Sequence, residues 1–178
     1  HVPAALVLPD MLDRLVLMTA PTKTFNIAGA HNGNVIIPDP DLRKAFETVT
    51  IAMGISPNSF GVHMETAAYS PAGAEWVDAL MAYLEENRKI FDAGVNAIPG
   101  VKSMPLEATY LAWVDFSGTG MEQAEIARRI EKEAKIAVNH GGTFGSGGES
   151  FMRFNLATRR ELVQEAVSRL NAAFGDLQ

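Results

Sequence analysis

The sequence predicts an α/β protein in which a long amphipathic helix joins two parts. Short apolar runs typical of strands alternate with segments of helical periodicity along the 178 residues. From Ala74 the apolar residues recur at helical spacing, and about twenty residues of helix span about 30 Å, enough to bridge two domains. We therefore expect one part over residues 1–73, an interdomain helix over residues 74–95 and a small C-terminal domain over residues 96–178.

The composition is that of a soluble globular protein with a hydrophobic core. The chain is 47% hydrophobic and 20% charged, with a formal net charge of -6. Its Lys and Arg residues are scattered, it has no cysteine, and it has no apolar stretch long enough to cross a bilayer. We expect a cytoplasmic protein that binds neither nucleic acid nor membrane. Because residue 1 is His rather than Met, we also expect a fragment of a longer chain.

The N-terminal part is predicted to contain strands and helices in alternation. Apolar runs bounded by turn residues predict a buried strand at Leu15–Met18 and a second strand at Asn34–Ile37. Asp39 followed by Pro40 predicts the N-cap and the first residue of a helix. Another helix is expected over residues 59–69. The first helix would direct four apolar residues inward: Leu42, Ala45, Phe46 and Val49.

The long helix is expected to bury one face and to solvate the other. Glu85 and Glu86 belong to the solvated face, and Gly94 is expected to end the helix. Its apolar face is expected to consist of Trp76, Leu80, Leu84 and Phe91.

The small domain is predicted to alternate strands and helices as well. Strands are expected at Thr109–Phe116, Ile136–Val138 and Phe151–Leu156. Thr119 and Glu122 have the spacing of a capping box for the intervening helix. The last helix is expected to carry Leu162, Ala166, Val167, Leu170 and Phe174 on its apolar face.

Several common kinds of site find little support in the sequence. The four histidines form no HxxxH pair and have no carboxylates at metal-ligand spacing, so we expect no metal site. No GxSxG elbow and no GxxxxGK[ST] phosphate loop is present.

Lys23 is the first residue to which a chemical role can be assigned. It follows a strand and is flanked by hydroxyl residues, a proline turn and an apolar run. Such surroundings can desolvate an amine and lower its pKa, as a Schiff-base lysine requires, and the hydroxyls could help to hold a phosphate. A lone lysine after a strand is nearly always a solvated surface charge, so these residues alone favour that interpretation over a cofactor lysine.

Arg153 is the second residue to which a chemical role can be assigned. Strand alternation puts Met152, Phe154 and Leu156 on a core face and places Arg153 on the opposite face, beside the glycine-rich run 141–149. Its planar guanidinium suits bidentate binding of a carboxylate. That carboxylate could be a structural partner or a ligand, and the spacing does not choose between the two.

The segment Thr19–Gly29 resembles the cofactor-lysine motif of class I and II aminotransferases, and most closely that of the cystathionine β-lyase-like (MalY and PatB) subgroup. The subgroup pattern is roughly Thr-Ser-x-Ser-Lys-Thr-Phe-Asn-Ile-Ala-Gly, and Lys23 falls on its lysine. The resemblance continues almost end to end, in Asn58–Gly61, Glu65–Tyr69, Trp76–Leu80 and Thr109–Trp113. It implies an aspartate aminotransferase-like fold, with the end of the large domain followed by the small domain.

The resemblance also implies a site for pyridoxal 5′-phosphate (PLP). Lys23 would carry the cofactor, and Thr19 and Thr22 fall on hydroxyl positions near its phosphate. Ala20 replaces a serine, which puts one phosphate contact in doubt. His31 is either a phosphate contact or a plain surface histidine. Arg153 would bind the α-carboxylate of an amino-acid substrate.

The activity implied is that of a PLP-dependent C–S β-lyase that releases pyruvate, ammonia and a thiol from cystathionine-like amino acids. An aminotransferase is the alternative, and a non-catalytic module on the same fold is an alternative of another class. The upstream half of such enzymes supplies the remaining PLP ligands, so activity would require that half. A homodimer is expected by analogy.

Overall fold

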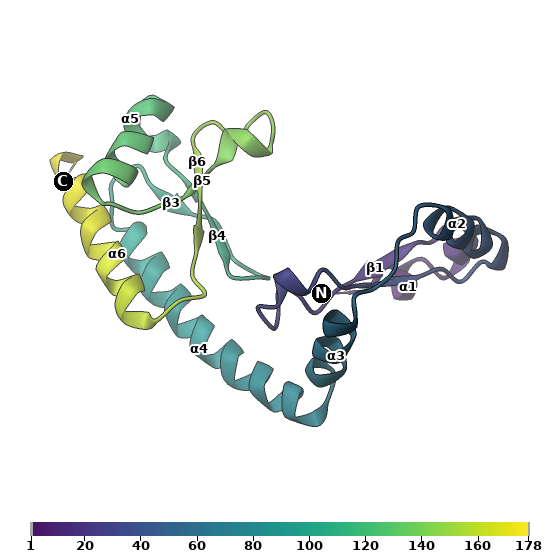
Figure 1. Cartoon of the computed structure of the whole chain (residues 1–178). Coiled ribbons are helices and arrows are strands. Elements are labelled where there is room, and N and C mark those ends of the chain that lie inside the picture. Colours follow the sequence, from purple (N-terminus) through teal and green to yellow (C-terminus); the bar gives the residue numbers. More distant parts are fainter. Residues whose placement is uncertain (1, 178) are drawn as a thin grey trace. The chain divides into compact units, whose positions relative to one another are not determined.

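The computed structural model of the chain describes residues 2–177 (Figure 1), so His1 lies outside the described residues. The chain divides into two units, one ending at Ala79 and the other beginning at Leu80. Helix α4 (Pro71–Val95) continues across that boundary. The domain limits expected at residues 73 and 95 stay a prediction. None of the described helices is long and apolar enough to cross a membrane.

The N-terminal unit contains a small antiparallel sheet and three helices besides the start of α4. Strand β1 (Leu17–Thr19) pairs with β2 (Asn34–Ile36). The helices are α1 (Ala4–Val7), α2 (Pro40–Ala52) and α3 (Ser59–Ala68). Short 3₁₀ turns occupy Pro9–Arg14 and Ala28–Ala30.

Side-chain caps explain where α2 and α3 begin. Oδ1 of Asp39 accepts a hydrogen bond from the Leu42 amide at 2.7 Å, which confirms the predicted N-cap with Pro40 as the first helical residue. Asn58 caps α3 in the same way, accepting from the Gly61 amide at 2.7 Å. Each cap satisfies a backbone N–H that the helix itself leaves unpaired.

The apolar residues of the N-terminal unit are largely exposed, which corrects two predictions. The strand expected to be buried is not, since Met18 of β1 is 68% exposed. On α2, Leu42 and Phe46 are half-buried, but Ala45 and Val49 are exposed. The reason is that β1 and β2 form a sheet of only two strands, too little to enclose an apolar face within the described chain.

The C-terminal unit is built on a four-stranded antiparallel sheet in the order β3–β4–β6–β5. These strands are β3 (Lys102–Ser103), β4 (Leu111–Asp115), β5 (Asn139–His140) and β6 (Phe151–Asn155). The unit also contains the rest of α4, helices α5 (Gln123–Arg128) and α6 (Arg160–Ala173), and a π-helical turn over Arg129–Glu133 (Figure 1).

One face of this sheet forms the hydrophobic core with α4, α5 and α6. Burial alternates along β6, where Met152 and Phe154 are buried and Phe151 and Arg153 are half-buried, as the sequence predicted. The core consists mainly of Phe91, Val95, Ile98, Ala112, Val114, Phe116, Ile126, Ile130, Met152, Phe154, Val163, Leu170 and Phe174.

Helix α4 begins earlier than predicted and ends at Val95, the expected limit and one residue beyond the glycine expected to stop it. It starts at Pro71 rather than Ala74, and Gly94 lies inside it. Phe91 is buried as predicted, whereas Trp76 is 46% exposed. The charged face is confirmed, since Glu85 pairs with Arg88, and Glu86 with Lys89.

Three further predictions in the C-terminal unit need correction. Thr119 belongs to a 3₁₀ turn and Gly120 adopts φ +68°, so α5 starts only at Gln123 and no capping box forms. No strand forms at 136–138, because β5 pairs with β6 through Asn139 and His140 instead. On α6, Val163 is buried in place of the predicted Leu162, which is exposed.

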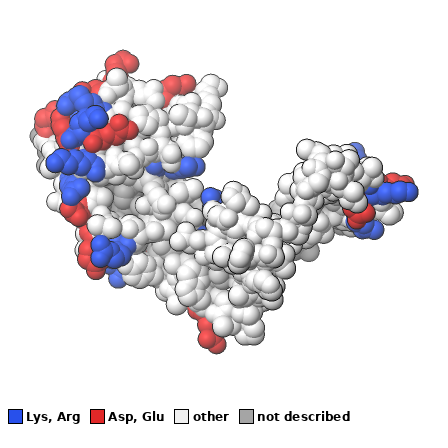
Figure 2. Space-filling model, viewed as in Figure 1, with Lys and Arg blue, Asp and Glu red and all other residues white. Residues whose placement is uncertain are grey.

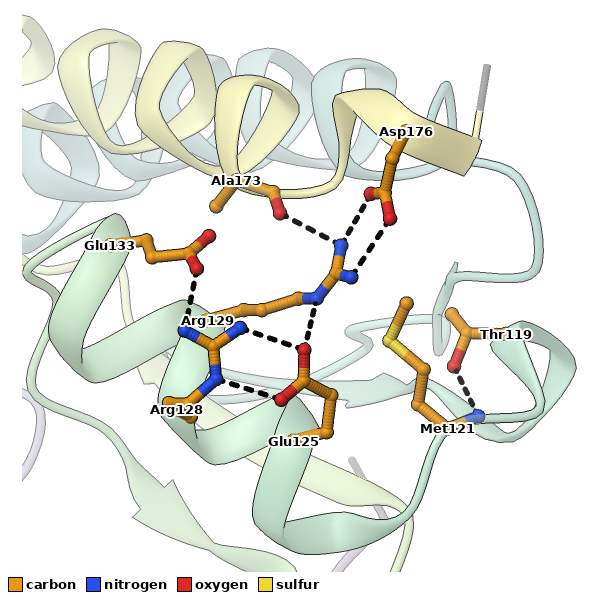
Figure 3. Close-up of polar contacts among 8 residues, drawn as sticks. All are labelled: Thr119, Met121, Glu125, Arg128, Arg129, Glu133, Ala173 and Asp176. Carbon is orange, nitrogen blue, oxygen red and sulfur yellow. Dashed lines mark hydrogen bonds and ion pairs between the residues drawn. The ribbon is translucent and has the colours of Figure 1, made fainter.

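Charged side chains link α5 to the end of the chain (Figure 3). Arg129 donates to the carboxylate of Asp176, to the carbonyl of Ala173 at 3.1 Å and to Glu125 at 2.8 Å. Glu125 also binds Arg128 through two hydrogen bonds of 2.7 and 2.8 Å. These bonds, with those to Arg128 the stronger cause, lower the pKa of Glu125 to about 2.

Candidate functional site

The lysine predicted to carry a cofactor lies in a tight turn of the N-terminal unit. The turn follows β1, and the amides of Phe25 and Ile27 donate to the carbonyls of Pro21 and Thr22, each at 3.0 Å. Asn26 adopts the left-handed conformation with φ +54°, which Asn tolerates better than most residues. The fold therefore presents Lys23 on a closed backbone turn rather than on an extended loop.

Aromatic stacking connects this turn to the start of α4. The rings of Phe25 and Trp76 lie 5.6 Å apart and 19° from parallel. A pocket of about 410 Å³ lies beside the turn and is lined by Pro21, Phe25 and Tyr69 among others. Lys23 is not part of its lining.

Side-chain hydrogen bonds fix the loop that follows the turn. Asn32 and Asn34 both donate to the carboxylate of Glu65 on α3. Asn58, besides capping α3, donates to the carbonyl of Ala30. Sequence reasoning predicted none of these contacts, because amide and carboxylate groups so far apart in the chain carry no signal before the fold brings them together.

The predicted cofactor residues all belong to one segment, from the end of β1 to the loop before β2. Thr19 ends β1 and pairs with Asn34, so the chain doubles back within fifteen residues. Thr22 is half-buried. His31 is exposed and adopts φ +46° at the end of the Ala28–Ala30 turn.

Lys23 itself is exposed, and it forms no salt bridge or side-chain hydrogen bond with another described residue. The desolvated amine expected from the sequence is thus not produced by residues 2–177 alone. The Lys23 side chain remains free for a ligand or for residues of another chain segment.

Arg153 lies in a row of three residues that crosses the sheet of the C-terminal unit. Register pairs it with Trp113 of β4 on one side and with Asn139 of β5 on the other. Because directly paired residues share a face, these side chains lie opposite the hydrophobic core. Strand alternation thus confirms the predicted orientation of Arg153 away from the core.

Within residues 2–177 the guanidinium of Arg153 has two partners, and neither of them is a carboxylate. Nη2 donates to Oδ1 of Asn139 at 2.9 Å, and the Cζ atom lies 4.5 Å from the centre of the Phe144 ring. Nε is buried and has no hydrogen-bond partner among the described residues. The sequence left open whether Arg153 pairs with a structural carboxylate or binds a carboxylate ligand. No structural carboxylate partner is found within residues 2–177.

The glycine-rich run is closed at its base by backbone contacts. A Cβ atom on Gly141 would lie 2.2 Å from the carbonyl oxygen of Gly148, so neither position has room for a side chain. The Phe151 amide donates to the same Gly148 carbonyl at 3.0 Å. Beside the run, Nε2 of His140 lies 2.7 Å from a carboxylate oxygen of Glu131. The loop therefore leaves and re-enters the sheet at fixed points.

Among residues 2–177, no group of three or more His, Asp or Glu side chains is arranged to hold a metal ion. The chemical groups available are thus an amine, hydroxyls and an imidazole in one unit and a guanidinium in the other. Each of these groups can donate a hydrogen bond to an anion.

Comparisons with known proteins identify relatives that contain a similar chain. No family model matches. Cystathionine β-lyase PatB of Bacillus subtilis is 38% identical over 175 residues, which are 97% of this chain and 45% of PatB. The chain thus spans about half the length of the curated relatives it matches.

Solved structures that contain PLP also match this chain over a little less than half of their own length. A PLP-bound protein of the aminotransferase type from Clostridium difficile 630 matches with a TM-score of 0.91 at 34% identity, covering 98% of this chain and 45% of that one. Cystalysin from Treponema denticola, whose structure contains PLP, matches with a TM-score of 0.86 at 32% identity, covering 96% and 43%.

Proposed function

Because this chain corresponds to the C-terminal half of the fold-type I PLP-dependent enzymes related to cystathionine β-lyases and aminotransferases, we propose that it forms the C-terminal half of a PLP-dependent C–S β-lyase. The substrates would be cystathionine-like amino acids. The observation that carries the proposal is the match to PatB along 97% of this chain.

The residues present fit the cofactor and its substrate. Lys23 offers an amine that no described residue engages, and Thr19, Thr22 and His31 belong to the same β1–β2 connection. We assign Lys23 to the aldehyde carbon of PLP and the other three to its phosphate. The guanidinium of Arg153 fits the carboxylate of an amino acid, because Nη1 has no hydrogen-bond partner among the described residues and no carboxylate neutralises the charge.

PLP, when bound, supplies the electron sink that stabilises negative charge at the substrate Cα. Nζ of Lys23, once free, takes the proton from Cα as a general base. Arg153 holds the carboxylate and so decides which bond to Cα is aligned for cleavage. A thiolate then leaves from Cβ, which yields pyruvate, ammonia and a thiol after hydrolysis.

The complete protein is proposed to shield Lys23. The upstream half would cover the exposed apolar surface of the N-terminal unit and supply the remaining cofactor contacts. In Figure 2 the surface over α3 carries almost no charged side chains, which supports the proposal that this surface is covered in the complete protein. A homodimer and a cytoplasmic location complete the proposal.

An aminotransferase is the second candidate, favoured by the match to the Clostridium difficile protein. The two activities differ in their need for a keto acid. The complete protein is expected to release pyruvate from cystathionine without any keto-acid acceptor. Strict dependence on an acceptor would instead identify an aminotransferase.

Lys23→Ala tests the cofactor assignment. The variant should lose at least about 10³-fold in kcat, because it lacks both the attachment point and the general base. Borohydride reduction of the unaltered protein should fix a pyridoxyl group on the Lys23 peptide, detected by mass spectrometry. Lys44→Ala, an exposed lysine of α2, is the matched control. Full activity of Lys23→Ala would refute the assignment and favour a non-catalytic module.

A further inference from the structure

The guanidinium of Arg153 is held from two directions. The Phe144 ring covers one face at 4.5 Å from Cζ, and Oδ1 of Asn139 accepts from Nη2 at 2.9 Å within the plane. The aromatic contact limits tilting of the plane, and the hydrogen bond limits rotation within it. Together they leave a long, flexible side chain with one preferred orientation.

Phe144 is itself supported, although it is 55% exposed. Its ring packs edge-on against Trp113 with centroids 5.7 Å apart, and Trp113 stacks on Phe151 at 5.2 Å and 12°. The ring belongs to the Gly141–Phe144 turn, whose start is fixed by the contact between Gly141 and Gly148. The aromatic cover over Arg153 is thus anchored to the sheet.

The guanidinium held in this way still has donors to offer. Nε is buried without a partner, and Nη1 makes no hydrogen bond to another described residue. Asn139 provides only one acceptor and no charge, so it does not neutralise the cation. An incoming carboxylate would provide both the charge and an acceptor for Nη1.

We infer that Phe144 and Asn139 are positioning residues that hold the guanidinium of Arg153 in the orientation that binds a substrate carboxylate. The inference rests on the proposed function, because it takes Arg153 as the carboxylate ligand. Neither residue touches the reacting atoms. Their contribution is to orient Arg153 before the substrate arrives, so losing either one should weaken carboxylate binding first and disturb the alignment at Cα only slightly, because the guanidinium itself remains.

The first test compares KM and kcat in the complete protein with cystathionine as substrate. Phe144→Leu and Asn139→Ala should each raise KM about 5-fold and leave kcat within about 2-fold. Phe144→Tyr, which keeps an aromatic face, should behave like the unaltered protein. Leu162→Ala, at an exposed apolar residue of α6, is the control and should change neither constant.

Calorimetric titration with pyruvate gives a comparison that needs no turnover. The Kd of pyruvate for the complete protein should rise about 5-fold in Phe144→Leu and remain unchanged in Phe144→Tyr. Loss of kcat with unchanged KM and Kd would overturn the inference.

A second test removes the guanidinium. Arg153→Ala should raise KM far more than either variant, and adding Phe144→Leu to it should have no further effect, because Phe144 acts through Arg153. Arg153→Ala could raise KM while Phe144→Leu raises KM by the same factor in the unaltered protein and in Arg153→Ala. In that case only the positioning inference fails. If Arg153→Ala leaves KM unchanged, the carboxylate site of the proposed function fails as well.

Discussion

At the scale of single residues, Gly94 decides how closely two helices of the C-terminal unit approach. A Cβ atom at this position would lie 2.1 Å from Cγ1 of Val167 on α6. Nδ2 of Asn171, also on α6, donates to the Gly94 carbonyl at 3.1 Å. Glycine in a helix interior costs about 1 kcal/mol relative to alanine, and the close contact is what compensates for it here.

Gly94→Ala should therefore lower the free energy of unfolding by about 1–2 kcal/mol, since overpacking outweighs the gain in helix propensity. Val167 is β-branched and cannot easily turn away. Chemical denaturation would measure the loss, and adding Val167→Ala should recover part of it. Gly175→Ala, where the new Cβ meets nothing within 4 Å, is the control. An unchanged stability of Gly94→Ala would contradict this packing.

At the scale of elements, the network around Glu125 and Arg129 attaches α5 to the chain end beyond α6 (Figure 3). The pKa of Glu125 falls from its ordinary value of 4.5 to about 2, chiefly through its hydrogen bonds with Arg128. A carboxyl whose pKa is lower in the folded state stabilises the fold above its unfolded pKa. That contribution disappears as the pH falls toward the folded value.

The stability of the protein should thus decrease between about pH 4.5 and pH 2 in part because Glu125 becomes protonated. Glu125→Gln removes this titration. The Tm difference between the unaltered protein and Glu125→Gln should be largest near pH 6 and shrink toward pH 2. Glu107→Gln, at an exposed residue, should show no such convergence. A Tm difference that is constant with pH would exclude this role of Glu125.

At the scale of the whole molecule, the two units differ in how well they enclose their apolar residues. The C-terminal unit buries its core against one face of a four-stranded sheet. In the N-terminal unit, Ile51 and Phe60 are 78% and 76% exposed. Soluble proteins rarely leave large apolar patches uncovered, which agrees with the proposed upstream half.

Phe60→Ser in the complete protein tests that covering. If the upstream half buries Phe60, the substitution should cost about 3 kcal/mol or more, as expected for a core phenylalanine. If Phe60 stays exposed, the change should be within about 0.5 kcal/mol. Thermal denaturation distinguishes the two outcomes, with Leu162→Ser on the exposed side of α6 as reference.

Local chemistry made several features of this protein predictable from its sequence. Asp39 and Pro40 specify the start of α2, because the cap depends on residues three positions apart. Alternation along β6 determined that Arg153 points away from the core. The motif around Lys23 is enough to indicate the family, whereas the shielding expected for its amine is not provided by the described chain.

The tertiary structure alone decided which distant groups meet. Pairing of β6 with β4 and β5 placed Trp113 and Asn139 on either side of Arg153, and no spacing in the sequence encodes that row. Likewise, the sequence predicted that Gly94 would end the helix, whereas the structure shows that Gly94 allows the close contact with Val167. Caps and alternation depend on bonds within a few residues, but the partners of a side chain depend on which strands and helices pack together.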